Sequence, residues 1–287
     1  AWWEEIEHES LRPVPLAGQQ IDAFETAEIN QHLLERKLVY SAGYGQRGKA
    51  HFFLGRLEDI SERRHFQIIV SSDEYARDLV SPVAMTLDRT IFLRRQALQR
   101  LLWEKVQEIS WNKAETALAR SLQGWDFSGN PENVLRQAAE RFLSVFADHE
   151  IGEVMAGEHL GERWEDMLGS HLDSRLELQL RAVRDFLADH LSTLPHLLEE
   201  MDEQCLHFYF GMLSPIRKTV YPRLLAAYDR WRESADPEPL RQLVEERVSD
   251  WLIACEDILA AHESQSTGGQ QRVADTLEQH LERINRD

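Results

Sequence analysis

The chain has 287 residues, of which 43% are hydrophobic and 29% are charged, and its formal net charge at pH 7 is −18. This composition is ordinary for a soluble globular protein, and the length suffices for one large domain or two. No apolar run approaches the ~18 residues that a membrane helix needs, and no leader pattern opens the chain. The two cysteines, Cys205 and Cys255, lack metal-type spacing, so we expect reduced thiols and a cytoplasmic protein.

The acidic excess lies in the C-terminal half of the chain. Residues 1–125 carry 16 Lys+Arg and 18 Asp+Glu, whereas residues 126–287 carry 16 and 32. This balance disfavours non-specific binding to nucleic acid and attachment to an anionic membrane. It is compatible with basic protein partners, with cations or simply with solubility. We therefore expect a protein partner, either a second copy or another protein, with no nucleic acid and no membrane insertion.

The first part of the chain changes from helical to strand-like spacing. Apolar residues predict a helix over residues 21–36. Short segments rich in Val, Ile, Phe and Tyr follow, separated by glycines and charges, at residues 37–42, 50–57 and 65–71. This pattern predicts a small antiparallel β-meander within residues 37–71.

From Ser72 onward the apolar residues recur at helical spacing. Residues 73–79 predict a short helix, and residues 87–122 predict a long one. Unbroken, the long helix would span about 54 Å, so we expect it to bend or break near Ser110.

The sequence Trp125-Asp-Phe-Ser-Gly-Asn-Pro131 is the clearest boundary signal. Ser or Asn can cap the next helix, and Pro suits its first position. Beyond it we predict a bundle of helices over residues 131–156, 162–193, 195–211, 214–235 and 240–262.

The predicted fold is mainly α, of the α+β class, in three parts. Residues 1–124 hold the small antiparallel sheet and the long helix. Residues 125–263 form an acidic multi-helix bundle. Residues 264–287 form a flexible linker, rich in Ser and Gly, and a polar C-terminal helix.

The helix predicted over residues 131–156 carries charged residues within an apolar pattern. At about 100° per residue, His149 and Glu153 share a face with Phe142 and Phe146, and Glu150 projects beside Phe146. Buried charges need partners or a metal. We therefore expect these three polar side chains to be mostly removed from water.

His149-Glu150-Ile151-Gly152-Glu153 is a His-Glu-x-x-Glu string. It resembles the His-Glu-x-x-His helix of zinc proteases, in which two ligands one turn apart bind the metal. A carboxylate stands in place of the second histidine, so membership of that class does not follow. His159 and Glu162, just beyond, could add ligands for a zinc, iron or manganese ion.

The alternative for this cluster is a structural ion-pair network. Arginines on neighbouring helices would then satisfy the carboxylates, the candidates being Arg136, Arg141, Arg163, Arg175, Arg181 and Arg184. Local spacing alone does not separate the two readings.

Gly43-Tyr-Gly-Gln-Arg-Gly48 matches the pattern Gly-x-Gly-x-x-Gly. Dinucleotide binding requires a helix to begin at this loop, but the residues that follow predict a strand. The simplest interpretation is a hairpin loop whose glycines adopt positive φ. The alternative is an anion site formed by loop amides at Gly43, Gly45 and Gly48 with Arg47 and Lys49.

Two function classes follow from the sequence. The first is a noncatalytic interaction or assembly protein, and the absence of an assembled catalytic motif favours it. The second is a metal-dependent helical-bundle enzyme or metal-binding protein that uses His149, Glu150 and Glu153. No substrate or reaction is indicated.

Overall fold

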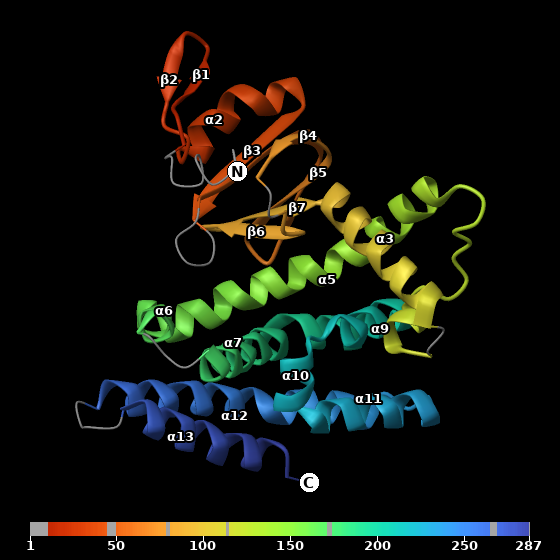
Figure 1. Ribbon diagram of the computed structural model, residues 1–287, viewed down its shortest axis with the longest axis vertical. Coiled ribbons are helices and arrows are strands. Elements are labelled where there is room, and N and C mark those ends of the chain that lie inside the picture. The colour runs from red at the N-terminus through yellow and green to blue at the C-terminus, as the bar shows by residue number, and fades with distance from the viewer. Residues whose placement is uncertain are drawn as a thin grey trace. The chain divides into compact units, whose positions relative to one another are not determined.

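The structure is a computed structural model that describes residues 11–44, 50–78, 81–112, 115–170, 174–264 and 269–286. The chain folds into two compact units (Figure 1). The first unit comprises residues 1–106 and 127–143, and the second comprises residues 107–126 and 144–287. Helix α5, Pro131–Leu160, contributes its N-terminal part to the first unit and the remainder to the second.

The first unit contains a two-stranded ribbon and a five-stranded sheet. Their strands are β1 Val14–Leu16, β2 Gln19–Ile21, β3 Leu38–Tyr44, β4 Ala50–Arg63, β5 Phe66–Arg77, β6 Ala84–Leu87 and β7 Thr90–Arg94. The sheet order is β3-β4-β5-β7-β6, and all neighbours are antiparallel except β5 and β7, which run parallel. The predicted antiparallel meander is present as β3, β4 and β5, and two further strands extend it.

Helix α2, Thr26–Leu33, packs on one face of this sheet and continues as the 3-10 turn η1, Leu34–Arg36. The Asn30 side chain fixes the contact, because its amide donates to the carbonyl of Tyr40 and accepts from the Tyr40 N–H, both at 2.8 Å. Because successive side chains of β3 point to opposite faces of the sheet, they contribute to two separate hydrophobic cores. Tyr40 packs with Ile21, Ile29, Leu33 and Ala42, while Val39 packs with Phe53, Ile69 and Phe92.

Two helix predictions for the first 125 residues are wrong. Residues 73–77 continue strand β5 rather than forming a helix, and residues 87–94 form the end of β6 and strand β7. Short apolar runs fit both periods, and Asp88, with φ of 53°, makes the turn that sequence spacing does not reveal. The long helix is only α3, Arg95–Asn112, and α4, Ala117–Ser121, follows it.

The second unit is helical. It includes the end of α3 from Gln107 onward, α4 and the C-terminal part of α5. Its other described elements are α6 Glu162–Gly169, α7 Ser174–Ala188, the π-helical turn η3 Asp189–Thr193, α8 Leu194–Glu200, α9 Glu203–Met212, α10 Pro215–Val220, α11 Pro222–Ser234, α12 Glu238–Glu263 and α13 Gly269–Ile284. Figure 1 shows α12 and α13 side by side. Among the described residues, no helix is both long and apolar enough to cross a membrane.

The predicted helices of this part are interrupted more often than expected. The helix expected over residues 162–193 is divided into α6, α7 and η3. The helix expected over residues 195–211 is divided into α8 and α9, because Met201 adopts the left-handed region with φ of 50° and ends α8. Pro222 begins a helix of its own, as a proline at the first position can. In the predicted linker, residues 265–268 lie outside the described residues. The three-part division of the chain stays a prediction.

Two features hold the centre of the second unit. Phe186, Tyr221 and Trp251 pack with ring centroids 5.1 to 5.3 Å apart, and all three are fully buried. Helix α5 crosses the end of α7 at Gly152, where a Cβ atom would lie 2.2 Å from the carbonyl oxygen of Ala188. Only glycine permits this approach, which brings the polar residues of the two helices together.

Candidate functional site

The candidate site lies where α5 meets α7 in the second unit. His149 and Glu153 are one helical turn apart on α5, so they share a face. Asp185 comes from the last turn of α7. One ligand atom from each of these three side chains lies within 4.8 Å of the other two. Ligands about 2.0–2.2 Å from one ion lie roughly 3 to 4.4 Å apart, so small side-chain movements would let the three share an ion.

The Asp189 carboxylate contacts four side chains around the site. Its side chain is fully buried, and it is the first residue of the π-helical turn that follows α7. Oδ1 lies 2.8 Å from Nδ1 of His149 and accepts from the Thr193 hydroxyl at 3.0 Å. Oδ2 accepts from the Tyr209 hydroxyl at 2.6 Å and from the Arg217 guanidinium. Four donors therefore fix this carboxylate, as a buried charge requires.

These contacts determine the charge of Asp189. Burial by itself would raise the pKa of Asp189, but Arg217 and then His149 outweigh burial and hold it well below its usual range. The carboxylate is therefore ionised and can only accept hydrogen bonds. His149 must donate to it through Nδ1, which leaves Nε2 directed at Glu153, with Nε2 and Oε1 3.5 Å apart.

The same contacts and burial shift the pKa values of the other ionisable groups in the cluster. Burial would lower the pKa of His149, but Asp189 and Glu153 outweigh burial and raise it well above 6.5. Burial would raise the pKa of Glu153, but contact with His149 lowers it. For Asp185, burial prevails over the attraction of Arg217, and the pKa is raised.

Two arginines flank the carboxylates. Arg217 contacts Asp189 directly, and its Nε lies 3.9 Å from Asp185. Arg184 donates to Glu165 at 2.8 Å and lies 3.8 Å from Glu153. If Arg184 is counted with Glu165, three carboxylates remain, and Arg217 is the arginine left to balance them. The raised pKa of His149 favours its protonated form, which makes the local charge minus one. A neutral His149, as metal binding requires, makes it minus two.

The structure brings together only part of the predicted ligand set. His149 and Glu153 meet, but their side chains are 26% and 32% exposed, so they are half-buried rather than removed from water. Glu150 is also half-buried and does not belong to the three-residue group. His159 and Glu162 are exposed and do not join it either, because α5 continues through Gly157 to Leu160 and no turn folds them back.

The second predicted site was the glycine loop. Gly43 is the penultimate residue of strand β3, where it pairs with His51. Gly45, Arg47, Gly48 and Lys49 lie outside the described residues. The anion-binding hypothesis for this loop therefore stays a prediction.

Asp185, Asp189 and Arg217 were missed from the sequence. The first two carried a signal, because they stand one turn apart within the apolar segment Asp185-Phe-Leu-Ala-Asp189. Charges embedded in such a segment need partners for the same reason as His149. Arg217 carried none, since its position depends on how α10 packs against α7.

Comparisons with known proteins identify a family. Residues 1–94 match the N-terminal domain, and residues 99–280 the C-terminal domain, of a family described as a family of unknown function (DUF6866). No curated protein and no solved structure matches the chain. The candidate site falls within the range of the C-terminal domain. The chain thus belongs to the DUF6866 family, and both domains of that family are represented in it.

Proposed function

We propose that this protein binds a divalent metal ion through His149, Glu153 and Asp185. The observation that carries the proposal is the convergence of one imidazole and two carboxylates from two helices. Histidine and carboxylate ligands suit zinc, iron(II) and manganese(II), and neither cysteine belongs to the group.

The Asp189 contact supports a metal role for His149. Metal-binding histidines commonly donate their second ring N–H to a carboxylate, which orients the ring and raises its basicity. Asp189 holds Nδ1 of His149 in this way at 2.8 Å. Nε2 is then the ring nitrogen available to an ion beside Glu153.

The local charge also favours a dication. Glu153, Asp185 and Asp189 carry three negative charges, and Arg217, which contacts Asp185 and Asp189, carries one positive charge. The sum is minus two with His149 neutral, once Arg184 is counted with Glu165. One divalent ion neutralises this charge. Without an ion, a protonated His149 neutralises only half of it.

The ligand count bears on what a bound ion would do. Closed structural sites use four protein ligands, whereas catalytic sites keep a position for water or substrate. Three ligands from two helices match the second arrangement. The ligand count therefore favours a metal-dependent enzyme over a purely structural metal site.

A chelator experiment separates metal binding from a structural ion-pair network. Thermal unfolding of the wild type should shift to lower temperature when EDTA is added. His149→Ala and Glu153→Gln should lower the melting temperature by themselves and show little further response to EDTA. If both variants are destabilised while EDTA leaves the wild type unchanged, the cluster is a structural network and the proposal fails.

An interaction role is the second candidate, and one groove favours it. Helices α7, α10 and α13 line an open groove of about 410 Å³. Its lining combines neutral polar residues with apolar side chains and two acidic residues on α13; the larger apolar and the acidic residues are Leu176, Val220, Leu277, Leu281, Glu278 and Glu282. This chemistry fits a basic amphipathic segment of another protein. A location in the cytoplasm belongs to the same proposal, supported by two buried cysteines that form no disulfide.

Charge reversal tests this second candidate. Glu278→Lys with Glu282→Lys should abolish the salt-sensitive binding of a basic amphipathic peptide to the intact protein. Glu245→Lys with Glu246→Lys, on α12 and outside the groove, is the matched control. Equal binding by both double variants would exclude the groove.

A further inference from the structure

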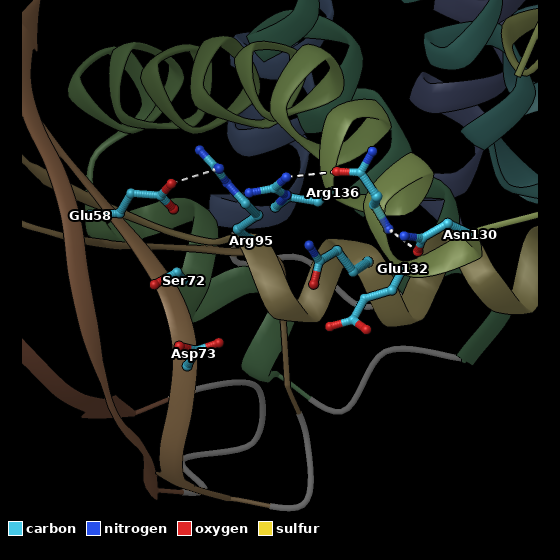
Figure 2. Close-up of a pocket in the computed structure, with 9 residues that line it drawn as sticks. Glu58, Ser72, Asp73, Arg95, Asn130, Glu132 and Arg136 are labelled. Carbon is cyan, nitrogen blue, oxygen red and sulfur yellow. Dashed lines mark hydrogen bonds and ion pairs between the residues drawn. The ribbon is translucent and has the colours of Figure 1, made fainter.

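The first unit contains a polar pocket that the metal cluster does not use. It has a volume of about 510 Å³ and lies among strands β4 and β5, the start of α3 and the first turns of α5 (Figure 2). This volume is within the range of about 300–1,000 Å³ that is typical of small-molecule sites. Its lining consists of charged, amide and hydroxyl side chains, so hydrogen bonds and charge must select any ligand.

One side of the pocket is cationic. Arg95 and Arg136 reach it from α3 and α5, and Figure 2 shows their guanidinium groups on the same side. Arg95 is only 12% exposed and pairs with Glu58 at 2.7 Å, while Arg136 donates to the Asn133 side chain at 2.6 Å. Nε of Arg95 is buried and has no hydrogen-bond partner among the described residues. A guanidinium has five N–H donors, so the two arginines keep donors for a ligand.

The other side of the pocket is anionic. Figure 2 shows the carboxylates of Asp73 and Glu132 away from the two guanidinium groups. Glu132 is exposed in the first turn of α5. Among the described residues Asp73 pairs with Arg56 at 3.4 Å, and both side chains are more than half exposed. These carboxylates can therefore receive a positively charged group.

We propose that this pocket binds a small zwitterion with one carboxylate and one ammonium group, which is the chemistry of a free amino acid. The carboxylate lies against Arg95 and Arg136, where it accepts charge-assisted hydrogen bonds from their free N–H groups. The ammonium group lies toward Glu132 and Asp73. Asn130 and Ser72 add neutral hydrogen-bonding groups to the lining.

The distribution of charge distinguishes this ligand from simpler ions. Inorganic phosphate would meet the two arginines but also the carboxylates of Asp73 and Glu132, which repel it. A simple amine would meet the carboxylates but leave the arginines without an anion. An apolar ligand would gain little, because burial of polar groups without partners is costly.

The test uses the intact protein and matched probes. Twenty free L-amino acids are screened by NMR, and the best binder is titrated beside its decarboxylated amine, its deamino acid and inorganic phosphate. Arg136→Gln and Glu132→Gln each remove one charge from an exposed side chain, so the fold is preserved. Arg36→Gln and Glu35→Gln are the controls, since both residues are exposed and lie outside the pocket.

The expected result is saturable binding of an amino acid, with each single-charge analogue binding at least about tenfold more weakly. Arg136→Gln and Glu132→Gln should each weaken binding by about tenfold or more, and the controls should have no effect. Three results would overturn the proposal: no amino acid binds at about 10 mM, phosphate or the amine binds as tightly as the amino acid, or neither pocket substitution changes the affinity. None of these results bears on the metal cluster in the second unit.

Discussion

Nδ1 of His149 lies 2.8 Å from Oδ1 of Asp189, forty positions later in the chain. Because Asp189 is ionised and fully buried, this contact sets both the orientation of the imidazole and the nitrogen that carries the proton. The same contact ties α5 to the π-helical turn after α7. Short π-helical turns frequently occur at functional sites.

The close approach at Gly152 should be intolerant of any side chain. In Gly152→Ala the new Cβ would lie 2.2 Å from the carbonyl oxygen of Ala188, so α5 and α7 must separate. We expect the free energy of unfolding to fall by about 2–4 kcal/mol, measured by urea denaturation. Gly157→Ala is the control on the same helix, because nothing lies within 4 Å of its Cβ position. This control should stabilise by up to about 1 kcal/mol, and equal losses in both variants would contradict the close approach.

Removing the charge of Asp189 should be among the costliest changes in the second unit. Asp189→Asn leaves Arg217, which is 14% exposed, without its main partner. We expect a loss of about 3–5 kcal/mol in the free energy of unfolding, whereas Tyr209→Phe removes one hydrogen bond and should cost about 1–2 kcal/mol. Asp166→Asn, at an exposed position on α6, should be neutral. A cost for Asp189→Asn no larger than that for Tyr209→Phe would mean that the network is not cooperative.

His190 should make stability depend on pH. Burial lowers the pKa of His190 from 6.5 to about 4. Between these pH values the imidazole is protonated in the unfolded chain but neutral in the folded protein. Stability should therefore fall as pH decreases from 6.5 toward 4, by about 3 kcal/mol in total. His190→Asn keeps a donor for the Phe186 carbonyl but does not titrate. The free energy of unfolding of the wild type should thus decrease more steeply below pH 6.5 than that of the variant, and parallel profiles would contradict the burial of a neutral His190.

The predicted boundaries of the three parts should be the first sites of proteolysis. Residues 123, 124, 126 and 128–130 are exposed, and so is Ser264, which follows α12. Exposed connections are the preferred sites of nicking. Limited trypsin and thermolysin digestion, followed by mass spectrometry, should give early cuts at residues 120–130 or 264–272. Dominant early cleavage within α3 instead would contradict the three-part division.

The helix that carries the candidate site could be predicted from the sequence. Charged residues within an apolar helix need partners or a metal, and this inference does not depend on the fold. His149 and Glu153 were identified for this reason. The sequence also suggested His159 and Glu162 as ligands, because Gly157 and Gly161 are typical of a turn. Helix α5 instead continues to Leu160, and the group of His149, Glu153 and Asp185 includes neither residue. A glycine within a helix costs only about 1 kcal/mol, which packing readily offsets.

The partners of the cluster depend on tertiary packing. Asp189 meets His149 because Gly152 admits Ala188, and Arg217 arrives from a helix later in the chain. No local pattern encodes either approach. The sheet could be predicted only in part. Strands β3, β4 and β5 follow one another along the chain, so local spacing indicates them. The parallel pairing of β5 with β7 requires a crossover connection that spacing does not reveal.

Elemental analysis is the most direct test of the central claim. The intact protein, purified without an affinity tag and dialysed against zinc, iron(II) or manganese(II), should retain about one divalent ion per chain after desalting. His149→Ala and Asp185→Asn should lose the ion, whereas Glu162→Gln, at an exposed position away from the cluster, should retain it. A wild-type protein that retains none of these metals, or variants that retain as much as the wild type, would contradict metal binding at this site.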